Sequence, residues 1–169
     1  MKKLLTYVLF AAMIVATTSC GPTTDDAIKY NDKIIKEQVK IITKINELYK
    51  AFDDFTNFAK IHKCYADGRA QLHTGTDAVA KLDKFDGNAD FRDGALKLFG
   101  LYKSILQNEL KQMIAINRLP NDQFTPEIKD KMQKLGEQSM KKMDDGLAEL
   151  QQTQSAFAKK YKFEIKKSD

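Results

Sequence analysis

The sequence lacks the residue patterns on which most enzyme sites are built. It contains no Gly-x-Ser-x-Gly elbow, no P-loop, no Gly-x-Gly-x-x-Gly turn and no His-Glu-x-x-His motif. Di-iron bundles use Glu-x-x-His pairs, but here Ala59 and Ala70 stand three residues before His62 and His73. The Cys-x-x-Cys-His motif of an attached haem is also missing. We therefore expect a non-enzymatic protein without a cofactor.

Charge of one sign is not gathered anywhere along the chain. The formal charge is +5, and loss of the first 20 residues would remove two of the 28 basic residues and none of the 23 acidic ones, leaving +3. The charges are well mixed, without a run long enough for a nucleic-acid arm and without the aromatic-basic pattern of RNA-binding modules. We expect no nucleic-acid partner.

Cysteine and histidine are too few and too scattered to predict a metal site. His62 and His73 are eleven residues apart, which on a helix separates them by about 16 Å, and Cys64 would face about 200° away from His62. We interpret the histidines as rim residues and Cys64 as a small flanking hydrophobe. A soft His/Met or thiol site is the weaker alternative.

The first 19 residues have the composition of a secretory signal peptide. A charged start at Lys2 and Lys3 precedes a largely apolar run at residues 4–16 and small residues at 17–19. A permanent membrane-spanning helix needs about 20 apolar residues, so this run is too short for one. The pattern predicts that residues 1–19 are cleaved off after export.

Cys20 follows the small residues directly and resembles the cysteine of a bacterial lipobox. That resemblance implies cleavage before the cysteine and acylation of its thiol and new amino group. Thr17 replaces the usual leucine, as in the relaxed boxes of Bacteroidota lipoproteins. Two or three acyl chains would anchor the protein stably, and residues 20–24 would form the lipidated cysteine and a short tether. The alternative is ordinary cleavage nearby, which would leave Cys20 as an exposed thiol.

The expected location is the outer membrane of the cell envelope, facing the periplasm or the surface. Gly21 replaces the aspartate that favours inner-membrane retention in the enterobacterial sorting rule. Asp25 and Asp26 resemble the acidic surface-export signal of Bacteroidota lipoproteins. They also fit the first turn of a helix capped by Thr23 or Thr24. Both explanations of the acids stay open.

Apolar residues at helical spacing indicate long amphipathic helices. The first covers residues 25–55, and the second covers 58–82 after cap residues at 53–57. A break at Asp67-Gly68 is the alternative within the second helix. The inner stripe of the first helix consists of Ala27, Asn31, Ile34, Gln38, Ile41, Ile45, Leu48, Phe52 and Phe55.

The third and fourth helices are set off by clear turn signals. Asp86-Gly87-Asn88 is a turn, with Asn88 as a candidate N-cap. The third helix runs to Leu119, and the fourth runs to Tyr161 after Thr125 as its N-cap. The inner stripe of the third helix consists of Phe91, Ala95, Leu98, Tyr102, Ile105, Gln112, Ile116 and Leu119.

Four such helices joined by short turns predict an all-α fold, an up-down-up-down four-helix bundle in residues 25–169. There is no strand-rich region, internal repeat or low-complexity linker. The mature length suits one domain with a proper core. With Cys20 lipidated, no internal disulfide can form, so stability has to come from packing.

Three stretches of the chain carry a family resemblance: YNDKIIKEQ at 30–38, KFDGNADFRDGALKLFGLYKSI at 84–105 and AFAKKY at 156–161. They resemble small helical-bundle lipoproteins of Bacteroidota and spirochaetes, described as leptospiral-type surface proteins. The resemblance implies a helical surface or periplasmic lipoprotein of unestablished activity. It carries over no functional residue except the lipidated cysteine, Cys20.

Asn31 and Gln38 are polar residues on the inner stripe of the first helix. Burying either amide without a partner would cost about 1–3 kcal/mol. Aligning the helices by level places Gln38 near His73 and Tyr102, and Asn31 nearer Thr76. We therefore predict an interior polar layer. Its first interpretation is specification of helix register, and its alternative is the lining of a small ligand pocket.

Two functions from different classes follow from these features. The first is a lipid-anchored envelope protein with a structural or interaction role, whose partners are the membrane and an unidentified envelope protein. The second is a module that binds a small molecule or soft metal between its helices. A cavity near Gln38 and Tyr102 would favour the second function, and a filled interior would favour the first.

Overall fold

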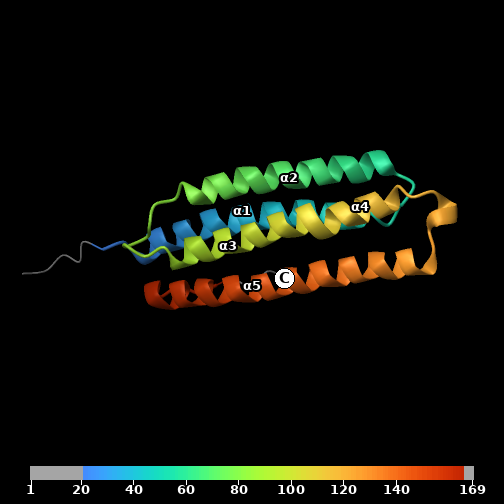
Figure 1. Cartoon of the computed structure of the whole chain (residues 1–169). Coiled ribbons are helices and arrows are strands. Elements are labelled where there is room, and N and C mark those ends of the chain that lie inside the picture. The colour runs from blue at the N-terminus through green and yellow to red at the C-terminus, as the bar shows by residue number, and fades with distance from the viewer. Residues whose placement is uncertain (1–20, 166–169) are drawn as a thin grey trace, which may run out of the picture.

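The computed structural model describes residues 21–165, most of which lie in helices (Figure 1). In chain order the elements are α1 (Thr24–Ala51), α2 (Phe58–Ala80), α3 (Asp90–Ile105), the π-helix η1 (Leu106–Leu110), α4 (Lys111–Asn117), the 3-10 helix η2 (Asn121–Gln123) and α5 (Pro126–Tyr161). Because α3, η1 and α4 follow one another without a loop, they form one long helical segment beside α1, α2 and α5. Residues 21–165 contain no strand. The all-helical prediction is confirmed.

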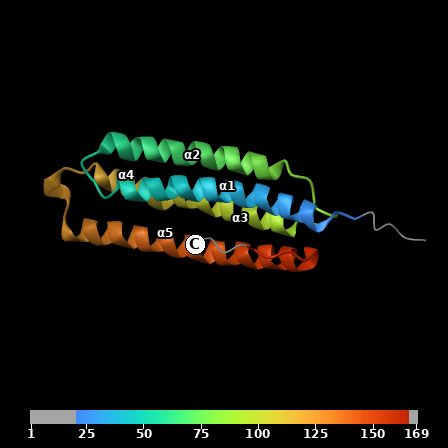
Figure 2. The ribbon, with the colours of Figure 1, turned by 180° about the vertical axis from the view of Figure 1, so that it is seen from behind.

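The helical segments lie side by side as a bundle, and the chain returns to the same end after every second segment (Figures 1 and 2). α1 packs against α2, α2 against α3, and α3 against α5, while α1 also touches α5. We call the end that holds Thr23, the loop 81–89 and Tyr161 the near end. There the Thr24 hydroxyl donates to the Tyr161 carbonyl over 2.9 Å, which joins the start of α1 to the end of α5.

The opposite end, which we call the far end, holds the loops 52–57 and 118–125 (Figure 1). Asn117 closes α4 there, and its Nδ2 donates to the Phe55 carbonyl over 3.0 Å. This bond joins the connection between α1 and α2 to the connection between α4 and α5.

α1 begins with a capping box formed by Thr23 and Asp26. The Thr23 hydroxyl accepts from the Asp26 amide (3.2 Å), and the Asp26 carboxylate accepts from the Thr23 amide (3.1 Å). The Thr23 hydroxyl also donates to this carboxylate, which lowers the pKa of Asp26. The predicted cap is confirmed, and one of the two acids after the tether has a structural role at the start of the helix.

The inner stripe of α1 is confirmed as far as Phe52. Its members from Ala27 to Leu48 are all buried, and Phe52 is only 6% exposed. α1 ends at Ala51, before the predicted end at residue 55. Phe55 therefore lies in the far-end loop with 44% of its surface exposed, and its placement on the inner stripe is wrong.

α2 begins where the sequence predicts and runs without a break. Asn57 Oδ1 accepts from the Lys60 amide over 3.1 Å and caps the helix. The alternative break at Asp67-Gly68 does not occur, since both residues lie within one continuous helix. Gly68 is buried there, facing α1 and Leu106 of η1.

The turn before α3 is confirmed, but its cap differs from the prediction. Asp86 and Gly87 have φ values of +52° and +74°, and the residues on either side exchange backbone hydrogen bonds of 2.9 Å, as in a two-residue I′ turn. Ala89 is the N-cap residue of α3 and makes no side-chain cap. Asn88 stabilises the helix start from one position earlier, because its Oδ1 accepts from the Asp90 amide over 2.8 Å.

The third helical segment contains a π-helix that the sequence pattern did not predict. η1 adds one residue to a turn, so the inner stripe moves forward by one position after it. Gln112, predicted to face inward, is exposed, whereas Leu110 and Met113 are buried. Glu109 within η1 is buried as well, with 6% of its surface exposed. π-turns often lie at functional sites.

Glycines determine how closely neighbouring helices pack. At Gly75 of α2, an added Cβ would lie 2.8 Å from Ile41 Cδ1 of α1. At Gly146 of α5, it would lie 2.6 Å from Leu101 Cδ2 and 2.9 Å from Leu98 Cδ1 of α3. Side chains do not tolerate separations this short. The ends of these Ile and Leu side chains therefore occupy the space that a side chain at Gly75 or Gly146 would need, and they would have to shift to admit one.

Replacing Gly146 tests this close approach. Gly146→Ala should lower the free energy of unfolding by about 1 kcal/mol, because overpacking against α3 outweighs the gain in helix propensity. Gly136→Ala in the same helix is the matched control, since no atom lies within 4 Å of its added Cβ. The control should raise the free energy of unfolding by about 1 kcal/mol. Urea unfolding measures both variants, and a stabilised Gly146→Ala protein would contradict the packing described.

Candidate functional site

Asn31 and Gln154 form a buried pair between α1 and α5. Gln154 Nε2 donates to Asn31 Oδ1 over 2.8 Å, and each residue is only 8% exposed. The Asn31 amide also donates from Nδ2 to Asp32 Oδ1 over 3.1 Å. Asn31 falls on the inner stripe that the sequence predicts for the first helix, but its pairing with Gln154 was not predicted. This hydrogen bond fixes the position of α5 along α1, close to the end of the bundle that holds Thr23 and Tyr161.

Gln38 and Tyr102 are both buried, as predicted, but they do not form the expected hydrogen-bonded layer. Tyr102 is fully buried, and its hydroxyl has no protein partner within hydrogen-bond geometry. Burial raises the pKa of Tyr102 to about 12, and the Gln38 side chain, which is near the hydroxyl but does not meet hydrogen-bond geometry, offsets only part of this effect. Tyr102 is therefore a neutral phenol in the core, which suits packing better than proton transfer.

His73 does not belong to the interior, and its predicted place in the polar layer is wrong. Its side chain is 79% exposed on the outer side of α2, with Nδ1 3.6 Å from Asp77 Oδ2. Leu72, the preceding residue, is the one that turns inward, with 6% exposure.

A second polar group lies between α1, η1 and α5. The Tyr49 hydroxyl is hydrogen-bonded to Ser139 Oγ, and the Ser139 hydroxyl donates to the Gly136 carbonyl over 2.8 Å. Tyr49 is therefore the donor in this pair. Burial, opposed by the Ser139 bond, raises the pKa of Tyr49, and the charge of Glu109 raises it further. A phenol held in its neutral form is a poor general base.

Only one of the two carboxylate oxygens of Glu109 has a partner in the described part of the chain. Its Oε1 lies 2.5 Å from Lys142 Nζ of α5, while its Oε2 is buried without a protein partner. The predicted inner stripe of the third helix did not include this residue. Its spacing of four residues from Ile105 was the available signal. The ion pair bridges η1 and α5, so we interpret it as a structural contact.

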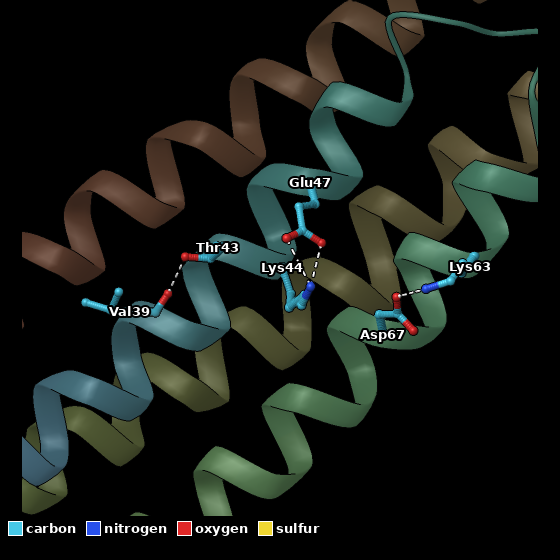
Figure 3. A network of polar contacts seen from close by, with 6 residues as sticks. All are labelled: Val39, Thr43, Lys44, Glu47, Lys63 and Asp67. Atoms are coloured by element: carbon cyan, nitrogen blue, oxygen red, sulfur yellow. Dashed lines mark hydrogen bonds and ion pairs between the residues drawn. The ribbon is translucent and has the colours of Figure 1, made fainter.

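The exposed faces of α1 and α2 carry a network of paired charges (Figure 3). On α1, Lys44 Nζ lies 2.7 Å from Glu47 Oε2, and on α2, Lys63 Nζ lies 2.6 Å from Asp67 Oδ2. The bond between Lys63 and Asp67 raises the pKa of the first and lowers the pKa of the second, and the charges on α1 act in the same directions. Because the four charges cancel, this face presents little net charge to a partner.

The remaining features to place are the two cysteines, any metal centre and any membrane-spanning helix. Cys20 lies outside the described residues. Within residues 21–165, no group of three or more His, Cys, Asp and Glu side chains is arranged to hold a metal ion, and no helix is long and apolar enough to cross a membrane. Cys64 is half-buried and packs against the core, which confirms its interpretation as a flanking hydrophobe.

The surface grooves between helices in the described part of the chain include four with volumes between about 240 and 420 Å³. Two follow the α3–α5 contact, with volumes of about 370 and 420 Å³. The others lie between α2 and the α3–η1 segment (about 240 Å³) and between α1 and α2 (about 250 Å³). None of the four is lined by Gln38 or Tyr102. The interior around these residues is filled by large, fully buried side chains, among them Ile34, Ile41, Leu98, Phe99 and Ile105.

The unbonded Tyr102 hydroxyl gives a pH-dependent prediction. Tyr102→Phe should leave the free energy of unfolding at pH 7 unchanged or raise it by up to about 1 kcal/mol, because a buried hydroxyl without a partner loses hydration. Between pH 10 and about 12, the unfolded chain ionises at this position while the folded protein does not. Wild-type stability is therefore lost as the pH rises, and the variant should lose about 1.4 kcal/mol less between pH 8 and 11.

Urea unfolding at each pH measures this difference, with Tyr30→Phe as the control. The Tyr30 hydroxyl donates to the Asp83 carbonyl over 3.0 Å, so its removal should cost about 1 kcal/mol at pH 7. If Tyr102→Phe lowered the free energy of unfolding as much as the control does, the Tyr102 hydroxyl would be bonded and the interior polar layer would exist.

No family model matches the sequence, and no curated protein or solved structure is significantly similar to it. The resemblance to leptospiral-type surface lipoproteins therefore stays a prediction that depends on three short stretches.

Proposed function

We propose that the protein is a lipid-anchored component of the cell envelope with a non-enzymatic structural or interaction role. In this proposal, residues 1–19 are a cleaved lipoprotein signal peptide, and Cys20 carries the lipid. The mature chain is an up-down-up-down four-helix bundle attached to the outer membrane, facing the periplasm or the surface. The membrane is its first partner, and an envelope protein is its second.

The observation that carries the proposal is the position of the start of α1. Only Gly21 and Pro22 stand between Cys20 and Thr23, the N-cap residue. A lipid on Cys20 would therefore hold the near end of the bundle against the membrane. The 28 residues of α1 span about 42 Å, so the far end would stand well away from the bilayer.

Exposed aromatic residues at the far end support an interaction role. Phe55 and Phe58 are each 44% exposed, and the Phe55 ring meets Phe124 edge-on at a centroid distance of 6.4 Å. Aromatic side chains are enriched at the centres of protein interfaces. Their place opposite the anchor is where a partner in the envelope can reach the protein.

The filled interior favours this proposal over a ligand site at the centre of the bundle. Gln38 and Tyr102 lie among closely packed side chains, and the Asn31 amide is already bonded to Gln154. Of the two explanations for the acids after the tether, the capping box supports a helix role for Asp26. Surface export remains a proposal for Asp25 and Asp26 together.

Native mass spectrometry of the full chain isolated from its own membrane tests the proposal. The expected mass is that of a chain beginning at Cys20 with two or three acyl chains, with an envelope protein bound. Phe55→Ser combined with Phe58→Ser should remove the bound protein by taking away the apolar contact at the far end.

Val39→Ser is the matched control, because Val39 is 49% exposed on the side of α1. This variant should keep the bound protein. A mature chain without acyl chains would overturn the anchor, and a partner retained by the far-end variant would place recognition elsewhere.

A further inference from the structure

The groove between α2 and the α3–η1 segment differs chemically from the other three. Its lining consists of Arg69, Leu72, His73 and Thr76 of α2 with Lys103, Leu106 and Gln107 of the facing segment. No acidic residue lines it, whereas Asp90, Glu37, or Asp145 with Glu149 line the other grooves. Asp77 lies 3.6 Å from His73 of the lining but does not itself line the groove. The groove therefore presents positive charge.

Arg69 is the most informative residue in this groove. The other two arginines are engaged: Arg92 donates to Asp93 and to the Leu82 carbonyl, and Arg118 contacts His62. Within residues 21–165, Arg69 has no hydrogen bond or ion pair, and its guanidinium lies 5.9 Å from the centroid of the Tyr65 ring. A planar fork of donors with no protein acceptor suits a carboxylate or phosphate.

The floor of the groove is apolar and is shaped by the π-helix. Leu72 and Leu106 are buried, with 6% and 1% of their surfaces exposed. Leu106 and Gln107 are the first two residues of η1. The wider turn of the π-helix therefore begins where the chain lines the groove. An apolar floor with a few polar groups above it is the usual composition of a small-molecule site.

We propose that this groove binds a small organic anion, with its charged group between Arg69 and Lys103 and its apolar part on Leu72 and Leu106. The Gln107 amide supplies a further donor at the same side. The volume of about 240 Å³ is below the range of about 300–1,000 Å³ typical of drug-sized ligands, which suits a single ring or short chain. This site goes beyond the envelope role proposed above, and only the choice of a free solute over a lipid headgroup uses the anchored orientation of that proposal.

The ligand is a free solute and not a lipid headgroup of the anchoring membrane. Arg69 lies midway along α2, eleven residues before Ala80 at the near end, a distance of about 17 Å. A headgroup beneath the near end would not reach it.

Isothermal titration of the full chain in detergent micelles tests the site, with phenyl phosphate and inorganic phosphate as probes. Phenyl phosphate should bind saturably with one site per chain. Arg69→Gln and Lys103→Gln should each weaken binding about tenfold, because each removes a charge-assisted contact. Inorganic phosphate should bind about tenfold more weakly than phenyl phosphate, because it leaves the apolar floor uncovered.

Lys97→Gln is the matched control, because it removes the same charge from the exposed side of α3, where Lys97 pairs with Glu149. The affinity of this variant for phenyl phosphate should be unchanged. Absence of saturable binding, an equal loss in the control, or equal affinities for the two probes would overturn the proposal. In nanodiscs, competition by an anionic lipid would overturn the assignment of the ligand as a free solute. The lipid anchor can be present or absent in each case, so the two proposals fail independently.

Discussion

The close approach of paired helices at glycine positions is the constraint on which the rest of the structure depends. At Gly75 of α2 and Gly146 of α5, the ends of Ile41, Leu98 and Leu101 from the neighbouring helix fill the space that a Cβ would take. Between α1 and α5, longer polar side chains make the contact instead. The Asn31–Gln154 bond and the Tyr49–Ser139 bond span this seam near its two ends. Buried hydrogen bonds of this kind specify the register of one helix against another, which apolar contacts alone specify less strictly.

Helical periodicity made most of the fold predictable, because a 3.6-residue repeat of apolar side chains has one stable arrangement. The stripe from Ala27 to Leu48 and the caps at Thr23, Asn57 and Thr125 follow directly from local chemistry. The π-helix could not be predicted, since one added residue in a turn leaves no mark on a regular stripe until the pattern behind it shifts, as at Gln112.

The candidate site was less predictable than the fold, because it depends on how helices rotate against each other. Alignment by height along the bundle does not determine which face of a helix a residue occupies, and His73 lies on the exposed face of α2. The same uncertainty hid the pairing of Asn31 with Gln154. Conversely, the groove around Arg69 involves residues from two segments that only tertiary packing brings together.

The residues that stabilise the bundle and the residues proposed to bind partners or ligands lie in different parts of the molecule. Buried amides and phenols join helices, while the positive groove around Arg69 and the exposed rings of Phe55 and Phe58 lie on the surface. The most direct test of this separation is the coupling energy of Asn31→Leu and Gln154→Leu in a double-mutant cycle, measured by urea unfolding. A structural pair predicts that each single variant strands a buried amide, that the double variant recovers part of the loss, and that the coupling is about 1–2 kcal/mol. Additive effects with no coupling would contradict it.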